Sequence, residues 1–168
     1  MPGKSSLYEQ DFVRWAEAQA EGLRRAAEAG SNLPLDWYNL AEEIESLGRS
    51  QRRELRSRLA IIIEHLLKLR FSPAIEPRAG WIEAIGRERR DIEDLLADSP
   101  SLRHELESLL AFAWQRTAPF VADILIRRGE AEEELRPQIE QAGYTVEQVL
   151  GDWLPESLAL GDALRFGA

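Results

Sequence analysis

Three polar side chains interrupt an otherwise apolar helical face near the middle of the chain. Gln51, Arg58 and His65 are each seven residues apart, which is almost two turns of an α-helix, so they lie nearly above one another. The residues around them are apolar at helical spacing from Leu40 to Leu69. Polar groups on a buried face need partners, because burying an unpaired polar group is costly. This polar line is therefore where we expect either chemistry or a structural ion pair.

The interpretation that we favour for the polar line is structural. Arg58 can pair with Glu54 one turn earlier or with Glu88 from a third helix, and buried pairs of this kind can specify how helices align. His65 would then donate a hydrogen bond to a carboxylate or to a backbone carbonyl. On this interpretation Arg58→Ala destabilises the fold by a few kcal/mol, because the partner charge is left buried and unpaired.

A second interpretation of the polar line is a ligand pocket, left open where a kinked fourth helix faces the second and third helices. Two guanidinium groups and an imidazole favour a small anionic ligand, because guanidinium binds carboxylate or phosphate through two hydrogen bonds. Helical bundles often hold ligands in their cores. The candidate ligand-binding residues are Gln51, Arg58, His65, Glu88 and Arg89.

Metal-dependent and other catalytic chemistry finds little support in the residue pattern. The chain has two histidines and no cysteine, and no glutamate lies three residues before His65, as it does in the Glu-x-x-His pairs of metal-binding bundles. His104 falls off the apolar face of its helix and is expected at the surface. The chain has no glycine-rich phosphate loop after a strand and no Gly-x-Ser-x-Gly motif. We therefore expect no metal ligand, no catalytic residue and no cofactor, while leaving open whether the protein is an enzyme.

Length and charge restrict the class of protein. The chain has 168 residues, 44% of them hydrophobic and 30% charged, which suits a globular domain with its own core. A net charge of −9 repels phosphate backbones, so we expect no nucleic-acid partner. The longest apolar run, Leu59 to Ile63, is far below the ~20 residues that cross a bilayer, so we expect no membrane segment. With no cysteine and no visible secretory signal, these features favour the cytoplasm.

Apolar periodicity predicts an all-α fold, an up-and-down bundle of four main helices with a short C-terminal helical extension. The four helices are expected over residues 8–29, 37–71, 80–97 and 100–128. The second helix is expected to end at Ser72-Pro73, and the sequence leaves open whether it is continuous or broken near Gly48. Asp36 and Ser99 are the expected N-caps of the second and fourth helices. A polar surface helix is expected at 131–141, followed by a capping box at Thr145 and Gln148. The expected inward-facing residues include Leu40, Leu47, Ile82 and Phe120.

The expected domain organisation is simple. One helical-bundle domain over residues 7–155 lies between a disordered N-terminus at 1–6 and a C-terminal tail at 156–168. The sequence shows no convincing strand, internal repeat or low-complexity segment.

A series of motifs over residues 8 to 155 matches a known family in the same order along the chain. The motifs are Tyr8-x3-Phe12-x2-Trp15, Asp36-Trp37-x2-Leu40-x-Glu42-Glu43-Ile44-Glu45-x-Leu47-Gly48-x-Ser50, Ser57-Arg58-Leu59, His65-Leu66-Leu67-Lys68, Trp81-x3-Ile85, Asp98-Ser99-Pro100-Ser101-Leu102 and Tyr144-Thr145-x-Glu147-Gln148 through Trp153-Leu154-Pro155. On these motifs the chain resembles the bacterial domain-of-unknown-function family 29.

The resemblance implies an all-helical cytoplasmic bacterial domain and implies no activity. The hallmark positions of the family carry over, without roles, as Glu42, Glu43, Glu45, Arg58, His65 and Lys68. The segment from Gly129 to Gly143 departs from the family pattern, because it is charged where related chains often carry a loop with proline and cysteine.

Taken together, the residues favour a protein-protein interaction domain without catalytic activity. Five tryptophans are many for a chain of this length, and Trp114 lies off the main apolar stripe of its helix, so an exposed tryptophan could anchor an interface. The partner would be a second copy of the chain, in a homodimer, or another protein. The alternative is a bundle that binds a small anionic ligand, or an unrecognised enzyme, using Arg58, His65 and Glu88.

Overall fold

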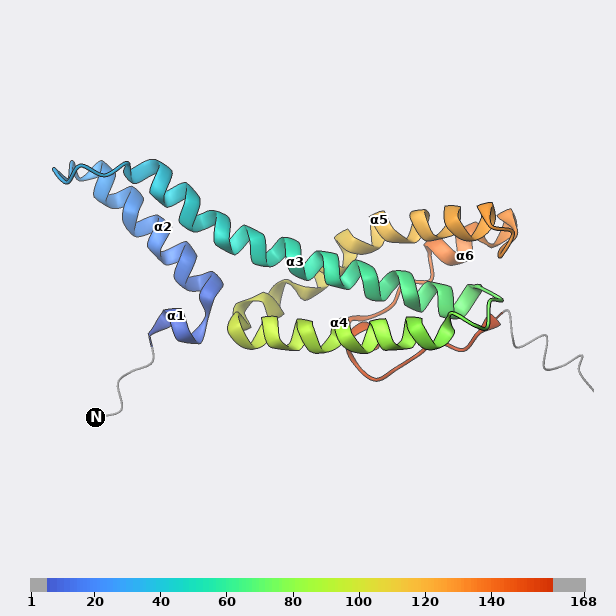
Figure 1. Cartoon of the computed structure of the whole chain (residues 1–168). Coiled ribbons are helices and arrows are strands. Elements are labelled where there is room, and N and C mark those ends of the chain that lie inside the picture. The colour runs from blue at the N-terminus through green and yellow to red at the C-terminus, as the bar shows by residue number, and fades with distance from the viewer. Residues whose placement is uncertain (1–5, 159–168) are drawn as a thin grey trace, which may run out of the picture. The chain divides into compact units, whose positions relative to one another are not determined.

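The computed structural model describes residues 6–158, and this part of the chain is helical with no strand. Its helices are α1 (Leu7–Gln10), α2 (Phe12–Glu28), α3 (Trp37–Phe71), α4 (Arg78–Asp98), η1 (Pro100–Glu105), α5 (Leu106–Arg127), η2 (Glu133–Leu135), α6 (Arg136–Glu140) and α7 (Val146–Leu150) (Figure 1). The predicted fold class is confirmed: four long helices, α2 to α5, are followed by short C-terminal ones.

Contacts divide the chain into two compact units. Of the described residues, unit 1 contains those up to Leu55 together with Glu93–Glu105, and unit 2 contains Arg56–Ile92 together with those from Leu106 on. The helix α3 is continuous through Gly48, and it contributes its first part to unit 1 and its second part to unit 2. Residues 1–5 and 159–168, which hold most of the predicted N-terminal and C-terminal segments, lie outside the described residues.

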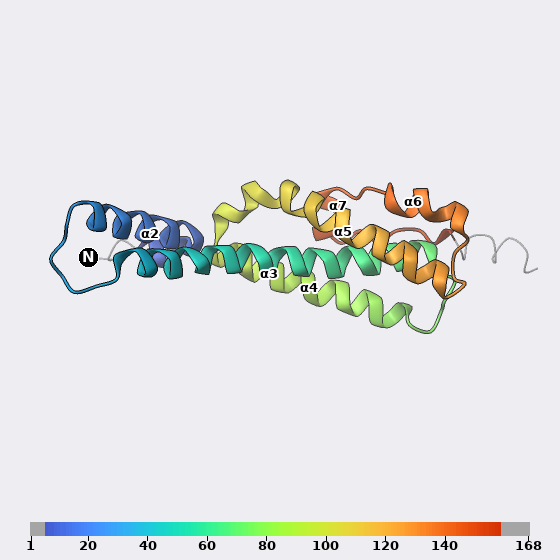
Figure 2. The same cartoon turned by 90° about the horizontal axis from the view of Figure 1, so that it is seen from above.

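Unit 1 is built on a hairpin of α2 and the first part of α3, seen best in Figure 2. Small residues fill the contact between the two helices, which lets their backbones approach closely. Gly48 of α3 lies against α2, since a Cβ built on it would be 3.7 Å from Val13 Cγ1. The buried residues of the hairpin include Val13, Ala16, Ala20, Ala41 and Leu55.

The N-terminal helix is the first place where the structure differs from the sequence-based expectation. A single helix was expected from Tyr8 to Ala29, but the chain breaks at Asp11, whose backbone is extended with φ −160° and ψ 98°. The Asp11 carboxylate accepts a hydrogen bond from the amide of Arg14 at 3.0 Å and so caps α2. The apolar periodicity runs through this break and conceals it.

Unit 2 packs α4 and α5 along the second part of α3 (Figures 1 and 2). Its core is a dense set of branched aliphatic side chains that are almost fully buried. They include Leu59, Ile62, Ile63, Leu66 and Leu67 of α3, Ile85 and Ile92 of α4, Val121 and Leu125 of α5, and Ile139 and Val149 of α6 and α7.

The expected helix signals have mixed outcomes. The amide of Asn39 donates to Asp36 Oδ1 at 3.2 Å, which confirms the cap of α3. Gly129 ends α5 with a φ of +69°, and the capping box of Thr145 and Gln148 is present. The predicted Ser99 cap is wrong: its Oγ is buried without a hydrogen bond among the described residues, and a 3-10 helix, η1, precedes α5.

Several residues expected to face inward are exposed. Leu40 and Leu47 are each 39% exposed, and Ile82 and Phe120 are exposed as well.

One helical stretch of the described residues, Pro100–Arg127, is long and apolar enough to cross a membrane by length and composition alone. Much of its α5 part is buried in the core of unit 2, as the core helix of a globular unit requires.

Candidate functional site

Arg58 is held by two carboxylates of α4. Its Nη1 donates to Glu88 Oε2 at 2.9 Å and to Asp91 Oδ2 at 2.6 Å. Glu88 is only 7% exposed, whereas Arg58 and Asp91 are half-buried. The predicted pairing with Glu88 is confirmed. Asp91 was missed, although its position three residues after Glu88 puts both on one face of a helix.

His65 is satisfied within its own helix. Its Nδ1 lies 2.7 Å from the carbonyl oxygen of Ile61, one turn earlier, and because a carbonyl can only accept, this nitrogen donates. The predicted donation to a backbone carbonyl is therefore confirmed. The half-buried imidazole makes no hydrogen bond to Arg58, so the two side chains do not form one hydrogen-bonded group in the described part of the chain.

Arg89 follows Glu88 in the chain but acts elsewhere in unit 2. Its guanidinium donates to three backbone carbonyls at 2.8 to 3.0 Å, those of Gln148, Val149 and Trp153. Burial lowers the pKa of Arg89. The Arg89 guanidinium thus binds the end of α7 and the segment after it to α4, and its N–H donors are used by backbone oxygens.

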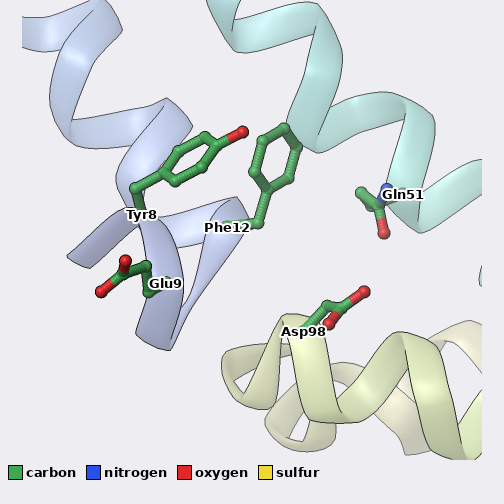
Figure 3. A pocket seen from close by; sticks show the side chains of 5 residues that line it. All are labelled: Tyr8, Glu9, Phe12, Gln51 and Asp98. Carbon is green, nitrogen blue, oxygen red and sulfur yellow. The ribbon is translucent and has the colours of Figure 1, made fainter. Parts of the chain in front are cut away.

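The fifth candidate residue, Gln51, belongs to unit 1 and lines a pocket that none of the other four candidate residues lines. This pocket of about 350 Å³ is lined by Tyr8, Glu9, Phe12, Gln51 and Asp98 (Figure 3). Of the five residues predicted from sequence, the structure brings Arg58 and Glu88 into contact. It engages His65 and Arg89 with separate backbone oxygens of unit 2, and it places Gln51 in unit 1.

In the pocket around Gln51, two polar groups face each other across the opening. The Gln51 amide comes from α3 and the Asp98 carboxylate from the end of α4, and each points toward the other (Figure 3). Neither side chain has a hydrogen bond or an ion pair with another described residue. Glu9 is turned away from them, and its carboxylate accepts a hydrogen bond from the Ser6 amide at 3.1 Å.

An aromatic cluster forms the other wall of this pocket. The ring centroids of Tyr8 and Phe12 are 5.9 Å apart, and Trp15 packs against both, at 4.8 Å from Tyr8 and 5.7 Å from Phe12. These distances are those of edge-to-face and offset-stacked pairs. The wall is therefore held in place by contacts among its own rings.

Asp11 stabilises unit 1 in a way that the sequence analysis did not predict. Its carboxylate accepts hydrogen bonds from the Ser101 amide at 2.7 Å and the Ser101 hydroxyl at 2.9 Å, besides the Arg14 amide. His104, which is exposed as predicted, lines a cavity of about 500 Å³ with Asp11 and Ser101. The serine donates to the aspartate and not to the histidine, so the three residues are not arranged as a catalytic triad.

Two of the hallmark acids of α3, Glu42 and Glu45, are part of ion pairs in unit 1. Arg49 pairs with Glu42 at 2.5 Å and with Glu45 at 3.2 Å, and Glu45 also accepts from Arg24 of α2 at 2.6 Å. The hydrogen bond from Arg24 holds the pKa of Glu45 below its usual value. Within residues 6–158, no group of three or more acidic or histidine side chains is placed to hold a metal ion.

Trp114, considered above as an interface anchor, lies at a core margin. Its Nε1 donates to the carbonyl of Glu140 at 2.8 Å, and its ring packs edge-on against Tyr144 at 5.3 Å. Trp153 contacts the same Tyr144 at 5.1 Å. These two tryptophans therefore have internal partners, and the exposed apolar residues lie elsewhere.

Comparison with known proteins adds a family and a fold. The model of the family described as "Domain of unknown function DUF29" matches residues 7–154. An α-helical protein of unknown function from Rhodospirillum rubrum ATCC 11170 is similar with a TM-score of 0.68 and 24% sequence identity, over 98% of this chain and 100% of that one. At this identity the likeness shows the fold alone. No curated protein matches the chain.

Proposed function

The chain belongs to the DUF29 family, and we propose that it is a protein-interaction domain without catalytic activity that binds its partner through unit 1. The observation that carries the proposal is the set of large apolar side chains that unit 1 leaves in solvent. Tyr38 is 63% exposed and Leu33 is 61% exposed, and Leu35, Leu40 and Leu47 accompany them on the hairpin. Exposed apolar groups that gather on one element are typical of interaction surfaces.

The helical spacing of these residues supports a binding face. Leu40 and Leu47 lie seven residues apart, so they share one side of α3, with Ile44 between them. This line, which we call the α3 stripe, reaches Gln51 and the pocket of Figure 3 one turn further on. Anchors at such spacing are what a partner helix or extended segment uses in a groove.

The charge of unit 1 favours a partner that is not a second copy. Its described residues carry seven arginines against fourteen aspartates and glutamates, a net charge of −7 out of −9 for the whole chain. A symmetric dimer would bring the same acidic surface together, and like charges facing each other oppose association. A basic protein partner fits this surface better.

The alternative, a small anionic ligand at Arg58, His65 and Glu88, is the weaker proposal. Such a ligand would have to compete with Glu88 and Asp91 for the Arg58 guanidinium, and the Arg89 guanidinium already faces three carbonyls. The family resemblance also supports a bacterial cytoplasmic setting for the interaction. A thermal-shift titration with phosphate and small carboxylates tests the alternative, because ligand binding to the native state raises the melting temperature.

The experiment for the interaction itself uses a photo-crosslinking side chain in the cells that make the protein. It replaces Leu47 in one variant and Arg53, an exposed residue on another side of α3, in the control. We expect one protein to crosslink from position 47 and not from position 53. That protein, once purified, should bind the natural chain and be released by Leu47→Asp at unchanged unfolding free energy. No adduct specific to position 47, or binding that survives Leu47→Asp, contradicts the proposal.

A further inference from the structure

The pocket beside the α3 stripe concentrates negative charge. Asp98 is the last residue of α4, where the aligned peptide dipoles leave a partial negative charge, and the last turn of this helix holds no basic residue. The Asp98 carboxylate has no ion pair among the described residues. Glu9 also lines the pocket, and no lysine or arginine does. The site therefore attracts a cation.

The aromatic wall adds a second feature that suits a cation. The faces of tyrosine, phenylalanine and tryptophan rings carry negative electrostatic potential and bind ammonium and guanidinium groups. Tyr8 is 54% exposed and Phe12 is half-buried, so both rings are within reach of a ligand that enters the pocket. Trp15 stacks behind Phe12 and holds that ring in place.

Gln51 supplies the third feature. Its amide is half-buried, lacks a hydrogen bond to any other described residue, and points across the pocket toward Asp98 (Figure 3). An amide oxygen accepts hydrogen bonds from the same donors as a carboxylate does. A guanidinium group, which is planar and has five N–H donors, can satisfy both acceptors while it lies on an aromatic ring.

We propose that the pocket of Tyr8, Phe12, Gln51 and Asp98 binds the side chain of an arginine on the partner protein. The inference rests on the proposed function, because it names the residue type that unit 1 recognises in its partner. The volume of about 350 Å³ is near the lower end of ligand pockets, which suits one long side chain. The net charge of −7 on unit 1 draws a basic segment toward the pocket, and the apolar α3 stripe contacts the residues beside the arginine.

The test compares two short capped peptides that differ in one atom group. One has the sequence Leu-Arg-Leu, and the other carries citrulline, the neutral isostere of arginine, at the centre. Titration followed by the backbone and Gln51 side-chain amide signals in NMR gives both dissociation constants. We expect the arginine peptide to bind at least about tenfold more tightly, and Asp98→Asn to abolish this preference.

Asp94→Asn is the matched control, because Asp94 is an exposed carboxylate one turn earlier on α4 and does not line the pocket. This variant should keep the preference for arginine. Phe12→Leu should weaken the binding of the arginine peptide, and an unchanged unfolding midpoint shows that the variant is folded. Equal binding of the two peptides, or a preference that survives Asp98→Asn, overturns the inference.

The inference and the proposed function fail in different ways. If the peptides bind equally while the crosslinked partner still depends on Leu47, the interaction stands and the arginine pocket is wrong. If the peptides are discriminated but no partner crosslinks from position 47, the pocket stands and the role of the α3 stripe is wrong. A lysine peptide that binds as tightly as the arginine peptide shows that charge alone is recognised and also overturns the choice of arginine.

Discussion

At the scale of single residues, one carboxylate holds two helix beginnings in unit 1. Asp11 caps α2 through the Arg14 amide and binds the first turn of η1 through the amide and hydroxyl of Ser101. An ionised acceptor of several hydrogen bonds contributes more than a neutral cap does. Because Asp11 is 7% exposed, its removal leaves these donors in a buried place.

Asp11→Ala should therefore cost about 2–3 kcal/mol of unfolding free energy, measured by urea denaturation. Asp36→Ala, which removes the exposed cap of α3, should cost about 1 kcal/mol and serves as the comparison. A loss for Asp11→Ala no larger than that for Asp36→Ala would mean that the Ser101 hydrogen bonds contribute nothing.

Arg58 gives a second residue-scale prediction. Arg58→Met should cost about 2–3 kcal/mol of unfolding free energy, because buried Glu88 then keeps only the more distant Arg87, at 3.7 Å. This loss is smaller than for a fully buried pair, since Arg58 is partly exposed. Adding Glu88→Gln should recover part of that loss, because it removes the buried negative charge of Glu88. Chemical denaturation of the two single variants and the double variant measures the coupling. If the double variant loses as much unfolding free energy as the two single variants together, the two side chains do not interact in solution.

Tyr144 provides a prediction for alkaline pH. Burial raises the pKa of its phenol from 10.0 to about 12, and the charge of Arg70 opposes this weakly. The folded state thus holds the proton more tightly than the unfolded state. The stabilisation is complete below pH 10 and is lost as pH rises from 10 toward 12. Tyr144→Phe should show a smaller loss of unfolding free energy over this range, and an identical pH profile would contradict the assigned burial.

The residues of the candidate site show which contacts sequence can predict. Glu88 was one of two partners expected for Arg58, beside Glu54, because an arginine on an apolar stripe needs a carboxylate and the facing helix offers one. The acceptors of Arg89 are backbone carbonyls, which leave no mark in the sequence. Asp98 and Gln51 are far apart in the chain and were never linked, since only the folding of unit 1 puts them in one pocket.

At the scale of elements, α3 was predictable and its neighbours were less so. The Asp36 cap and Ser72-Pro73 set its expected limits, and Gly48 does not interrupt it. The break before α2 and the 3-10 helix η1 were both missed. Asp11 caps α2 and also binds Ser101 of η1, ninety residues away in the chain, and such a contact leaves no local pattern in the sequence. Local capping rules favoured Ser99, whose hydroxyl has no hydrogen bond among the described residues.

Glycines within and after helices give an element-scale prediction. Gly48→Ala should stabilise unit 1 by about 0.5–1 kcal/mol, because alanine favours helix and the new Cβ meets Val13 at an ordinary 3.7 Å. Gly129→Ala should instead destabilise the protein, since Gly129 ends α5 with a φ of +69°. Thermal unfolding of both variants checks the opposite signs. A destabilising Gly48→Ala would mean that α2 and α3 cannot accept a methyl group.

At the scale of the whole molecule, the division into two units predicts that stability is local. Asp11→Ala should accelerate amide hydrogen exchange mainly in α2 and the first part of α3, whereas Arg58→Met should do so in α4 and the second part of α3. Exchange measured by mass spectrometry on proteolytic fragments distinguishes the two patterns. Uniform acceleration across the chain in both variants would show a single cooperative unit.

The three carbonyl groups that accept from Arg89 also affect when unit 2 can fold during synthesis. Arg89 is translated 60 residues before Val149 and 64 residues before Trp153. A guanidinium that is buried without these acceptors is costly, so the nascent α4 cannot bury this side chain while the segment up to Trp153 is still inside the ribosome. Unit 2 therefore completes its folding only after Trp153 has left the ribosome.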